Sequence, residues 1–246
     1  MAREFEIRRE VELSATPEEV WEAVATNAGT AAWMFPSGEI EPHEGGKTAD
    51  GATVQKWDPP RHFAVRFEGE GGFFNAIEFV IEGREGGTTL LRYLHSGIFT
   101  DDWDNQYDAV NQHTDFYLHT LGQYLEHFSG RAVTYIGDVP GGINAPEAAA
   151  KPGSFATLKH ALGVGDGAAE GDSVALDLDG LGQIDGVVDY ARGNFLGIRT
   201  PDALYRFFGR DAFGFPVGMQ IHEFSVGVDK DGVQETWQRW LNGVYA

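Results

Sequence analysis

Residues 101–129 read DDWDNQYDAVNQHTDFYLHTLGQYLEHFS, and the spacing within this stretch decides the fold. Residues suited to a buried face recur at alternating steps of three and four: Tyr107, Val110, Thr114, Tyr117, Leu121, Tyr124 and Phe128. This spacing aligns them along one side of an α-helix and predicts a single long helix with an apolar seam. Asp101 and Asp102 precede the seam, and we expect their side chains to cap the first turn.

The two halves of this predicted helix differ in polarity. Leu118 and Leu125 widen the apolar face in the second half, whereas Trp103, Asn111 and His113 lie in the first half. We therefore expect the second half to seal a protein core and the first half to line a cavity that holds water or a ligand. The plain alternative is that the whole seam is core packing, which is the usual role of aromatic stripes.

Composition and charge exclude several classes of partner and site. The chain has 246 residues, enough for one large or two modest domains, and a formal net charge of -20. Such a charge repels phosphate backbones and anionic lipids, so we expect no nucleic-acid and no membrane partner. With no cysteine, the chain has no disulfide and no thiolate site. We find no signal-peptide pattern and no long apolar run, and we expect a soluble, cytoplasmic protein.

Upstream of the helix, the sequence predicts a strand, two short helices and a run of antiparallel strands. Residues 3–13 alternate apolar and charged side chains, which is typical of a half-exposed strand. Thr16, Pro17 and Glu19 form a helix-start signal. The strands predicted after the two helices are 54–57, 63–67, 74–81 and 89–95. A curved sheet closed by the long helix buries all these apolar faces and leaves a space between sheet and helix.

Three short motifs carry a resemblance to a known family. They are ATPEEVW at 15–21, WDPPR at 57–61, and Thr89 with the HSG of 95–97. With these motifs in this order, residues 3–129 resemble the START-like (SRPBCC) superfamily, in the branch named for the activator of the heat-shock-protein-90 ATPase. The resemblance implies an α+β helix-grip fold, in which a curved antiparallel sheet wraps around a long C-terminal helix. The superfamily includes lipid carriers and polyketide cyclases.

The second half of the chain repeats the order of elements of the first half. Residues 137–153 are rich in Gly, Pro and Ala and predict a connection. The elements predicted around them are strands at 132–136, 174–178, 186–191, 195–198, 203–208 and 219–226, and helices at 155–162 and 233–244. We predict two tandem domains, a START-like domain at 1–130 and a second, abbreviated helix-grip domain at 131–246. The alternative is that residues 131–246 extend the first sheet.

Aromatic and polar side chains of the first unit are the candidates for a ligand site, because they combine apolar area with groups that orient a ligand. The predicted ligand-binding residues are Trp33, Phe35, Phe63, Val65, Phe67, Tyr93, His95, Trp103, Tyr107, Val110 and Tyr117. His95 and His113 are also the candidates for a general acid or base. The alternative is that both histidines are structural.

The sequence predicts neither a metal site nor a cofactor. His113, His119 and His127 are spaced by six and eight residues, which scatters them around a helix. The stretch 177–185 resembles a calcium loop, but Leu181 and Val188 stand where that loop needs acidic ligands, so we predict a turn.

Three functions follow from these features. We favour non-enzymatic binding of a small hydrophobic or aromatic molecule between sheet and helix. The second hypothesis, implied by the resemblance, is an enzyme of the polyketide cyclase or aromatase kind. The third follows the name of the branch and is a co-chaperone that contacts a protein partner.

Overall fold

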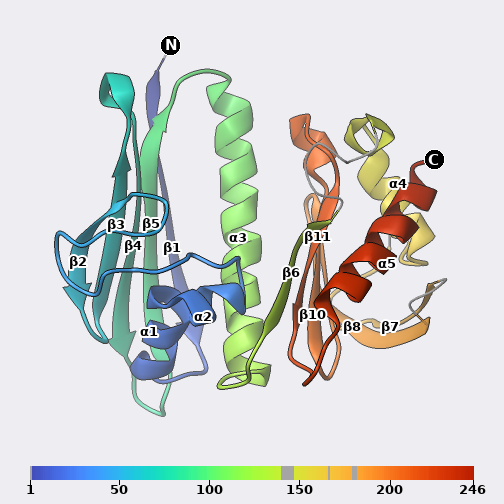
Figure 1. Ribbon diagram of the computed structural model, residues 1–246, viewed down its shortest axis with the longest axis horizontal. Helices are drawn as coiled ribbons and strands as arrows, with labels where there is room; N and C mark the ends of the chain where they lie inside the picture. The colour runs from blue at the N-terminus through green and yellow to red at the C-terminus, as the bar shows by residue number, and fades with distance from the viewer. Residues whose placement is uncertain (1, 140–146, 166, 179–181) are drawn as a thin grey trace. The chain divides into compact units, whose positions relative to one another are not determined.

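The computed structural model describes residues 2–139, 147–165, 167–178 and 182–246 (Figure 1). The chain divides into two compact units, Met1–Arg131 and Ala132–Ala246. Each unit has its own antiparallel sheet and its own hydrophobic core. Among the described residues, no helix combines the length and the apolar character that a membrane span requires.

The first unit is a five-stranded sheet packed against a long helix. Its elements are β1 (Arg3–Leu13), α1 (Pro17–Ala25), α2 (Asn27–Ala31), β2 (Thr53–Asp58), β3 (His62–Glu68), a 3₁₀ turn (Glu70–Gly72), β4 (Phe74–Gly83), β5 (Thr89–Phe99) and α3 (Trp103–His127). The strand order is β1-β5-β4-β3-β2. The predicted α+β, helix-grip fold is confirmed.

Local sequence signals explain where the first and the last helix of this unit begin. In α1, the Thr16 hydroxyl accepts a hydrogen bond from the Glu19 amide at 3.3 Å, and the Glu19 carboxylate accepts one from the Thr16 amide at 2.9 Å, which completes a capping box. At α3 the expected cap is wrong. Asp102 is the residue before the helix, but its φ of 36° is left-handed, and its side chain makes no capping bond. A capping side chain needs the extended backbone that Thr16 has.

The core of the first unit confirms that the second half of the long helix seals the interior. Leu118, Leu121 and Leu125 of α3 are buried and belong to the same cluster as Val20 and Trp21 of α1. The sheet contributes Phe63, Phe79, Ile81 and Leu91 to this cluster.

The second unit is a six-stranded sheet with two helices. Its elements are β6 (Thr134–Val139), a 3₁₀ turn (Glu147–Ala150), α4 (Ser154–Ala161), β7 (Ser173–Leu178), β8 (Gly182–Arg192), β9 (Phe195–Arg199), β10 (Ala203–Phe208), a 3₁₀ turn (Arg210–Phe213), β11 (Gly218–Glu223) and α5 (Lys230–Val244). The strand order is β6-β11-β10-β9-β8-β7. The second half therefore does not extend the first sheet, and that alternative is wrong.

The predicted connection at 137–153 begins too early. β6 continues through Val139, which is buried and pairs with Met219 of β11. Residues 140–146, within the predicted connection, and residues 179–181, within the calcium-like stretch, lie outside the described residues.

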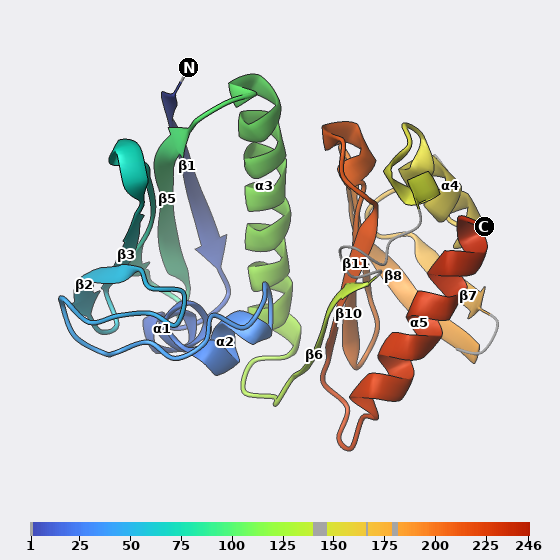
Figure 2. The ribbon, with the colours of Figure 1, turned by 45° about the horizontal axis from the view of Figure 1, so that its top comes forward.

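Both units share one strand topology, which the ribbon views show (Figures 1 and 2). In each unit the first strand pairs with the last strand, and the other strands follow in reverse chain order. Each unit also ends in a helix that runs close to its first strand: α3 lies near β1 and α1, and α5 lies near β6 and α4.

Candidate functional site

The inner face of the first sheet changes from sealed to open along its strands. On β4, the inward positions Ile81 and Phe79 are 3% and 5% exposed, whereas Ile77 is half-buried and Asn75 is exposed. These four residues alternate along one strand, so they point to the same side of the sheet. The gradient therefore describes one surface that leaves the core at Ile77.

The neighbouring strand β3 shows the same gradient in register with β4. Phe63, paired with Phe79, is 3% exposed, Val65 is half-buried, and Phe67 is 37% exposed. β5 leads directly into α3, so the open end of the face lies toward the first half of the helix. The prediction that the polar-aromatic half of the helix lines a cavity concerns this end of the sheet, and it stays a prediction.

A polar pair lies in the centre of the open end. His95 of β5 is directly opposite Ile77, and its Nε2 donates a hydrogen bond to Asn75 Oδ1 at 2.6 Å. Phe5 of β1 packs edge-to-face on the imidazole, with ring centroids 5.1 Å apart. Gly97 makes room for this ring, because a Cβ there would lie 2.7 Å from Phe5. The imidazole is thus held by an amide on one side and an aromatic ring on another.

His95 is a neutral hydrogen-bonding group at neutral pH. Burial lowers its pKa from 6.5 to about 4, although the side chain keeps some accessible surface. Protein surrounds the imidazole on most sides while solvent still reaches it, which is the combination expected in a concave site. Because Nε2 donates to Asn75, Nδ1 carries a lone pair, and no group within the described residues donates to it.

Arg9 of β1 fixes the helix to the sheet beside this pair. Its Nε lies 2.5 Å from Asp115 Oδ1, and its Nη2 donates to Asn111 Oδ1 at 2.7 Å, both on α3. Next to it, burial raises the pKa of Tyr93 to about 12, against the opposing effect of a hydrogen bond with Thr114. Tyr93 therefore stays protonated, and the charge of Arg9 is compensated by Asp115.

Four of the predicted ligand-binding residues are held in structural contacts. Trp33 is buried, and its Nε1 donates to the Ala23 carbonyl at 2.9 Å. Phe63 is buried in the core. Trp103 and Tyr107 stack on each other at 4.7 Å, with the Arg3 guanidinium 3.8 Å from the Trp103 ring. These contacts fasten the start of α3 to β1.

The other predicted residues lie on the sheet, on α3 and in the segment after α2, and Tyr93 and Tyr117 among them pack against the sealed core. The sheet carries Val65, Phe67, Tyr93 and His95 on one inner face. Tyr117 of α3 contacts Phe35, which is 45% exposed, with ring centroids 6.3 Å apart. Val110 is half-buried on the same helix.

His113 is tied to its own helix. Its Nδ1 donates to the Ala109 carbonyl at 2.7 Å, one turn earlier in α3, and its ring lies 6.2 Å from that of Tyr117. Nδ1 of His113 is therefore used in a hydrogen bond within its own helix. Nδ1 of His95, in contrast, receives no hydrogen bond from the described residues.

Sequence reasoning missed Asn75, Ile77 and Phe5 as part of this surface. The signal was present, because Asn75 and Ile77 share the parity of Phe79 in the predicted strand 74–81, and Phe5 shares the parity of Ile7. Only the strand register shows that Asn75 reaches His95 across the sheet.

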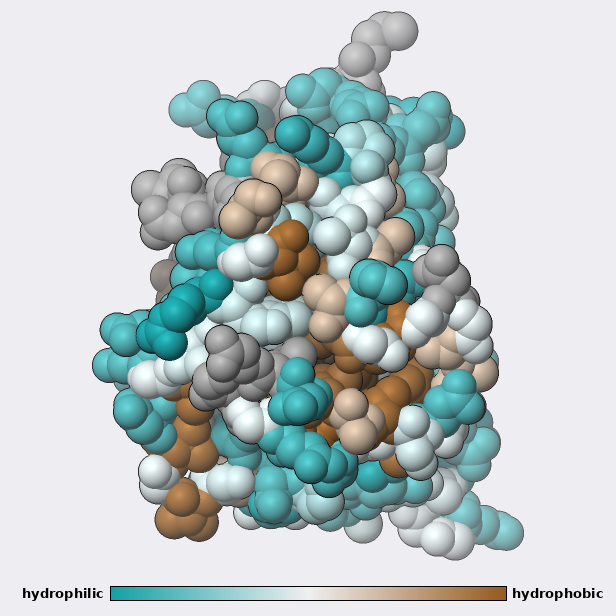
Figure 3. All heavy atoms as spheres, turned by 90° about the vertical axis from the view of Figure 1, so that its right-hand side faces the viewer, coloured by the Kyte–Doolittle hydropathy of each residue, from teal (hydrophilic) through white to brown (hydrophobic). Residues whose placement is uncertain are grey.

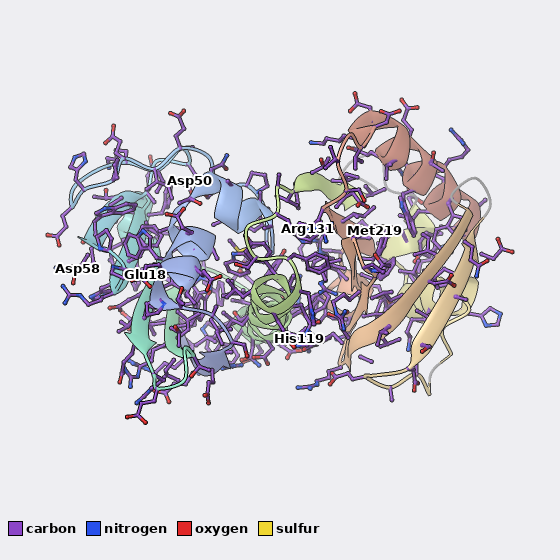
Figure 4. All side chains as sticks on the ribbon, turned by 90° about the horizontal axis from the view of Figure 1, so that it is seen from below. Glu18, Asp50, Asp58, His119, Arg131 and Met219 are labelled. Atoms are coloured by element: carbon purple, nitrogen blue, oxygen red, sulfur yellow. The ribbon has the colours of Figure 1, made fainter. Side chains whose placement is uncertain are left out.

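Acidic side chains do not form a metal centre in the part of the chain that is described. No group of three or more His, Asp or Glu residues converges there. Asp58, labelled in Figure 4, lies at the outer edge of the first unit on the side away from α3, and it pairs with Arg61 at 3.0 Å.

Comparison with known proteins places the first unit in a family. Residues 14–126 match the family model described as "Activator of Hsp90 ATPase homolog 1-like protein". This match spans slightly less than half of the chain and confirms the resemblance found in the sequence. A comparison with curated proteins gave no match.

Solved structures similar to this chain cover about half of it. Protein MLL2253 from Mesorhizobium loti is 18% identical, with 51% of this chain and 99% of that chain covered and a TM-score of 0.43. CalU16 from Micromonospora echinospora is 21% identical, with 51% and 86% covered and a TM-score of 0.39. The Aha1 dimer from Colwellia psychrerythraea is 22% identical, with 50% and 96% covered and a TM-score of 0.38.

At these TM-scores, the solved structures add no weight to the assignment, which rests on the sequence match and on the topology of the first sheet. Residues 14–126 therefore form a domain of the Activator of Hsp90 ATPase homolog 1-like family.

Proposed function

We propose that the first unit binds a small, neutral hydrophobic or aromatic molecule at the open end of its inner sheet face. The observation that carries this proposal is the loss of burial from Phe79 to Ile77 to Asn75 on one face of β4. Apolar side chains facing a helix and still reached by solvent gain free energy when a ligand covers them. Covering about 200 Å² of apolar surface is worth roughly 5 kcal/mol before the entropic cost of binding.

The polar groups of the site favour a neutral ligand that carries a hydroxyl group. His95 Nδ1 accepts a hydrogen bond, and the Asn75 amide offers both a donor and an acceptor. Arg9, the nearby cation, is paired with Asp115 and is not available to neutralise a ligand carboxylate. A phenol or a similar hydroxylated aromatic compound fits these groups.

The low pKa of His95 favours a role in ligand binding over a role as a proton donor. With a pKa of about 4, only about one molecule in a thousand carries a protonated His95 at pH 7, so a general acid would rarely be present. A cyclase or aromatase activity, with His95 Nδ1 as a base, is our second candidate. It predicts turnover that His95→Gln abolishes while binding remains.

A third candidate, a co-chaperone role, is tested by capture of Hsp90 from solution. This role predicts that the wild type captures Hsp90 and that Val65→Trp, in which the ligand site is blocked, captures it equally well. Failure of the purified chain to bind Hsp90 would remove it.

The test of the binding function is thermal unfolding of the full chain in a library of neutral aromatic and aliphatic compounds. A ligand that binds the folded state raises the melting temperature according to its concentration relative to Kd. Val65→Trp fills the open end and should abolish the shift. Val80→Trp, the same change on the outer face of β4, should retain it. No stabilising compound, or equal loss in both variants, would contradict the proposal.

We also propose that residues 131–246 are a second helix-grip domain and that the chain is a tandem. The support is the strand order common to both sheets, with the first strand next to the last, and a C-terminal helix beside the first strand in each unit. Production of the two halves as separate chains tests this, because each should then unfold cooperatively on its own.

A further inference from the structure

One edge of the second sheet, along β7, is open. β7 is the last strand in the sheet order, and among the described strands it pairs only with β8. Figures 1 and 2 show this strand at the margin of the second unit. Within the part of the chain that the structure describes, no group outside β8 forms a hydrogen bond with the β7 backbone. This edge is therefore free to pair with another strand.

The hydrogen bonds at the start of β7 show which residues face this edge. The Asp172 carbonyl accepts a hydrogen bond from the Val188 amide of β8 at 2.8 Å, so this carbonyl points toward β8. In an antiparallel ladder, the direction of the backbone groups alternates from one residue to the next. The amides and carbonyls of Ser173, Ala175 and Asp177 therefore point away from β8, and all three residues are exposed.

The end strands β1, β2 and β6 are covered or carry like charges. At β2, the Gly45 amide of the preceding loop donates to the Val54 carbonyl at 2.8 Å. At β1, Trp103 Nε1 donates to the Glu4 carbonyl at 3.1 Å, and four of the six exposed residues of this strand are glutamates. Pairing of two β1 strands would bring these glutamates together. α5 lies near β6. β7, in contrast, carries a single charged residue.

Apolar side chains beside the open edge remain partly accessible. Val174 of β7 and Ile184 of β8 keep accessible surface on the face that carries the core residue Leu176, which is 1% exposed. Figure 3 looks at the right-hand side of Figure 1, where α5 and β7 lie, and shows a brown region recessed among hydrophilic residues. A strand added to β7 would therefore cover apolar surface as well as backbone groups.

We propose that β7 pairs with β7 of a second copy of this chain, antiparallel about Ala175. In this register Ala175 lies opposite the partner's Ala175, and Ser173 lies opposite the partner's Asp177. Each opposed pair exchanges two backbone hydrogen bonds, and the Ser173 hydroxyl reaches a carboxylate. On the inner face, Val174 lies beside the partner's Leu176. A shift by two residues would leave one facing residue of each strand unpaired, so this register is the self-complementary one.

The size and the charge of this interface set its strength. A pair of six-residue edges is small beside the roughly 1,200–2,000 Å² that a stable interface buries. Each chain also carries a net charge of -20, which repels a second copy. We therefore expect a weak dimer, with a Kd of about 10–100 μM, that added salt strengthens by screening the repulsion. Because pairing uses the open edge of both copies, assembly stops at the dimer.

The test is sedimentation equilibrium of the full chain up to a concentration about tenfold above the expected Kd, at low and at high salt. Ala175→Pro removes the central amide of the edge, which does not bond to β8, so the fold should survive. Ala175→Lys sets two like charges opposite each other across the two-fold axis. Both variants should be monomeric, and circular dichroism checks that they are folded.

A second pair of variants tests the register. Ser173→Lys places a cation opposite the partner's Asp177 and should strengthen the dimer about three- to tenfold, whereas Ser173→Asp should weaken it by a similar factor. Ser225→Lys makes the same change of charge in the exposed loop after β11 and should have little effect.

Each outcome decides the proposal. A dimer that Ala175→Lys abolishes and that Ser173→Lys alone strengthens supports it. A wild type that stays monomeric at high salt over the whole concentration range overturns it. A dimer that persists in Ala175→Lys, or that Ser173→Lys and Ser225→Lys affect equally, also overturns it.

Discussion

The pKa of His95 gives a prediction that depends directly on the geometry of the first unit. In the folded chain the pKa of His95 is about 4, below the ordinary value of 6.5. Between these two pH values, the unfolded chain therefore binds a proton at His95 and the folded chain does not. The stability contributed by neutral His95 is complete above pH 6.5 and is lost as the pH falls toward 4. The full shift corresponds to about 3 kcal/mol, and since solvent partly reaches the imidazole we expect roughly 1–2 kcal/mol.

The assay compares the wild type with His95→Gln, which keeps an amide donor for Asn75 but does not titrate. Between pH 6.5 and 4, the free energy of unfolding of the wild type should fall by that amount more than in the variant. Proton NMR of the imidazole rings should also show one of the eight histidines, absent from the variant, with a midpoint well below 6.5. Parallel pH profiles, or a midpoint near 6.5, would refute the enclosure of His95.

Three further changes test the fold, each by chemical unfolding of the full chain. Thr16→Ala removes the capping box of α1 and should cost about 1 kcal/mol, whereas Thr16→Ser should cost little. Leu121→Ala empties a site that is 0% exposed and should cost roughly 2–5 kcal/mol, more than any surface substitution on α3. Asp189 and Arg206 form a bidentate pair at 2.8 Å with side chains 4% and 1% exposed, so Asp189→Ala should cost roughly 3–5 kcal/mol. The double variant Asp189→Leu with Arg206→Met should lose less stability than Asp189→Ala, because it leaves no buried charge unpaired. A larger loss in the double variant would contradict this explanation.

Periodicity and turn signals were sufficient for most of the fold. The predicted strand 203–208 coincides with β10, and the predicted helix 233–244 lies within α5, whose Asp229 cap accepts from the Gly232 amide at 3.1 Å. The cap of α3 could not be predicted, because Asp102 has a left-handed backbone, which is uncommon for residues other than glycine. The end of β6 was missed because Gly137 resembles the connection that follows it.

The sequence predicted a list of candidate site residues, and their role in binding stays a prediction. The polarity change along residues 101–129 correctly indicated which half of the helix seals the core, because that property is local. The roles of Trp33 and Phe63 depend on which neighbours reach them, and a buried aromatic residue has the same sequence pattern as a ligand-lining one. Asn75 depends on strand register, which alternation alone does not give.

The most direct test of the account is NMR of the full chain with labelled Ile and Val methyl groups, titrated with the strongest compound from the thermal screen. We predict saturable shifts of the Ile77 and Val65 methyl resonances, weakened in His95→Gln if the ligand carries a hydroxyl group. The methyl groups of the sealed core, such as Ile81, should shift little. A compound that stabilises the protein and leaves both Ile77 and Val65 unchanged would contradict ligand binding at the open end of the sheet.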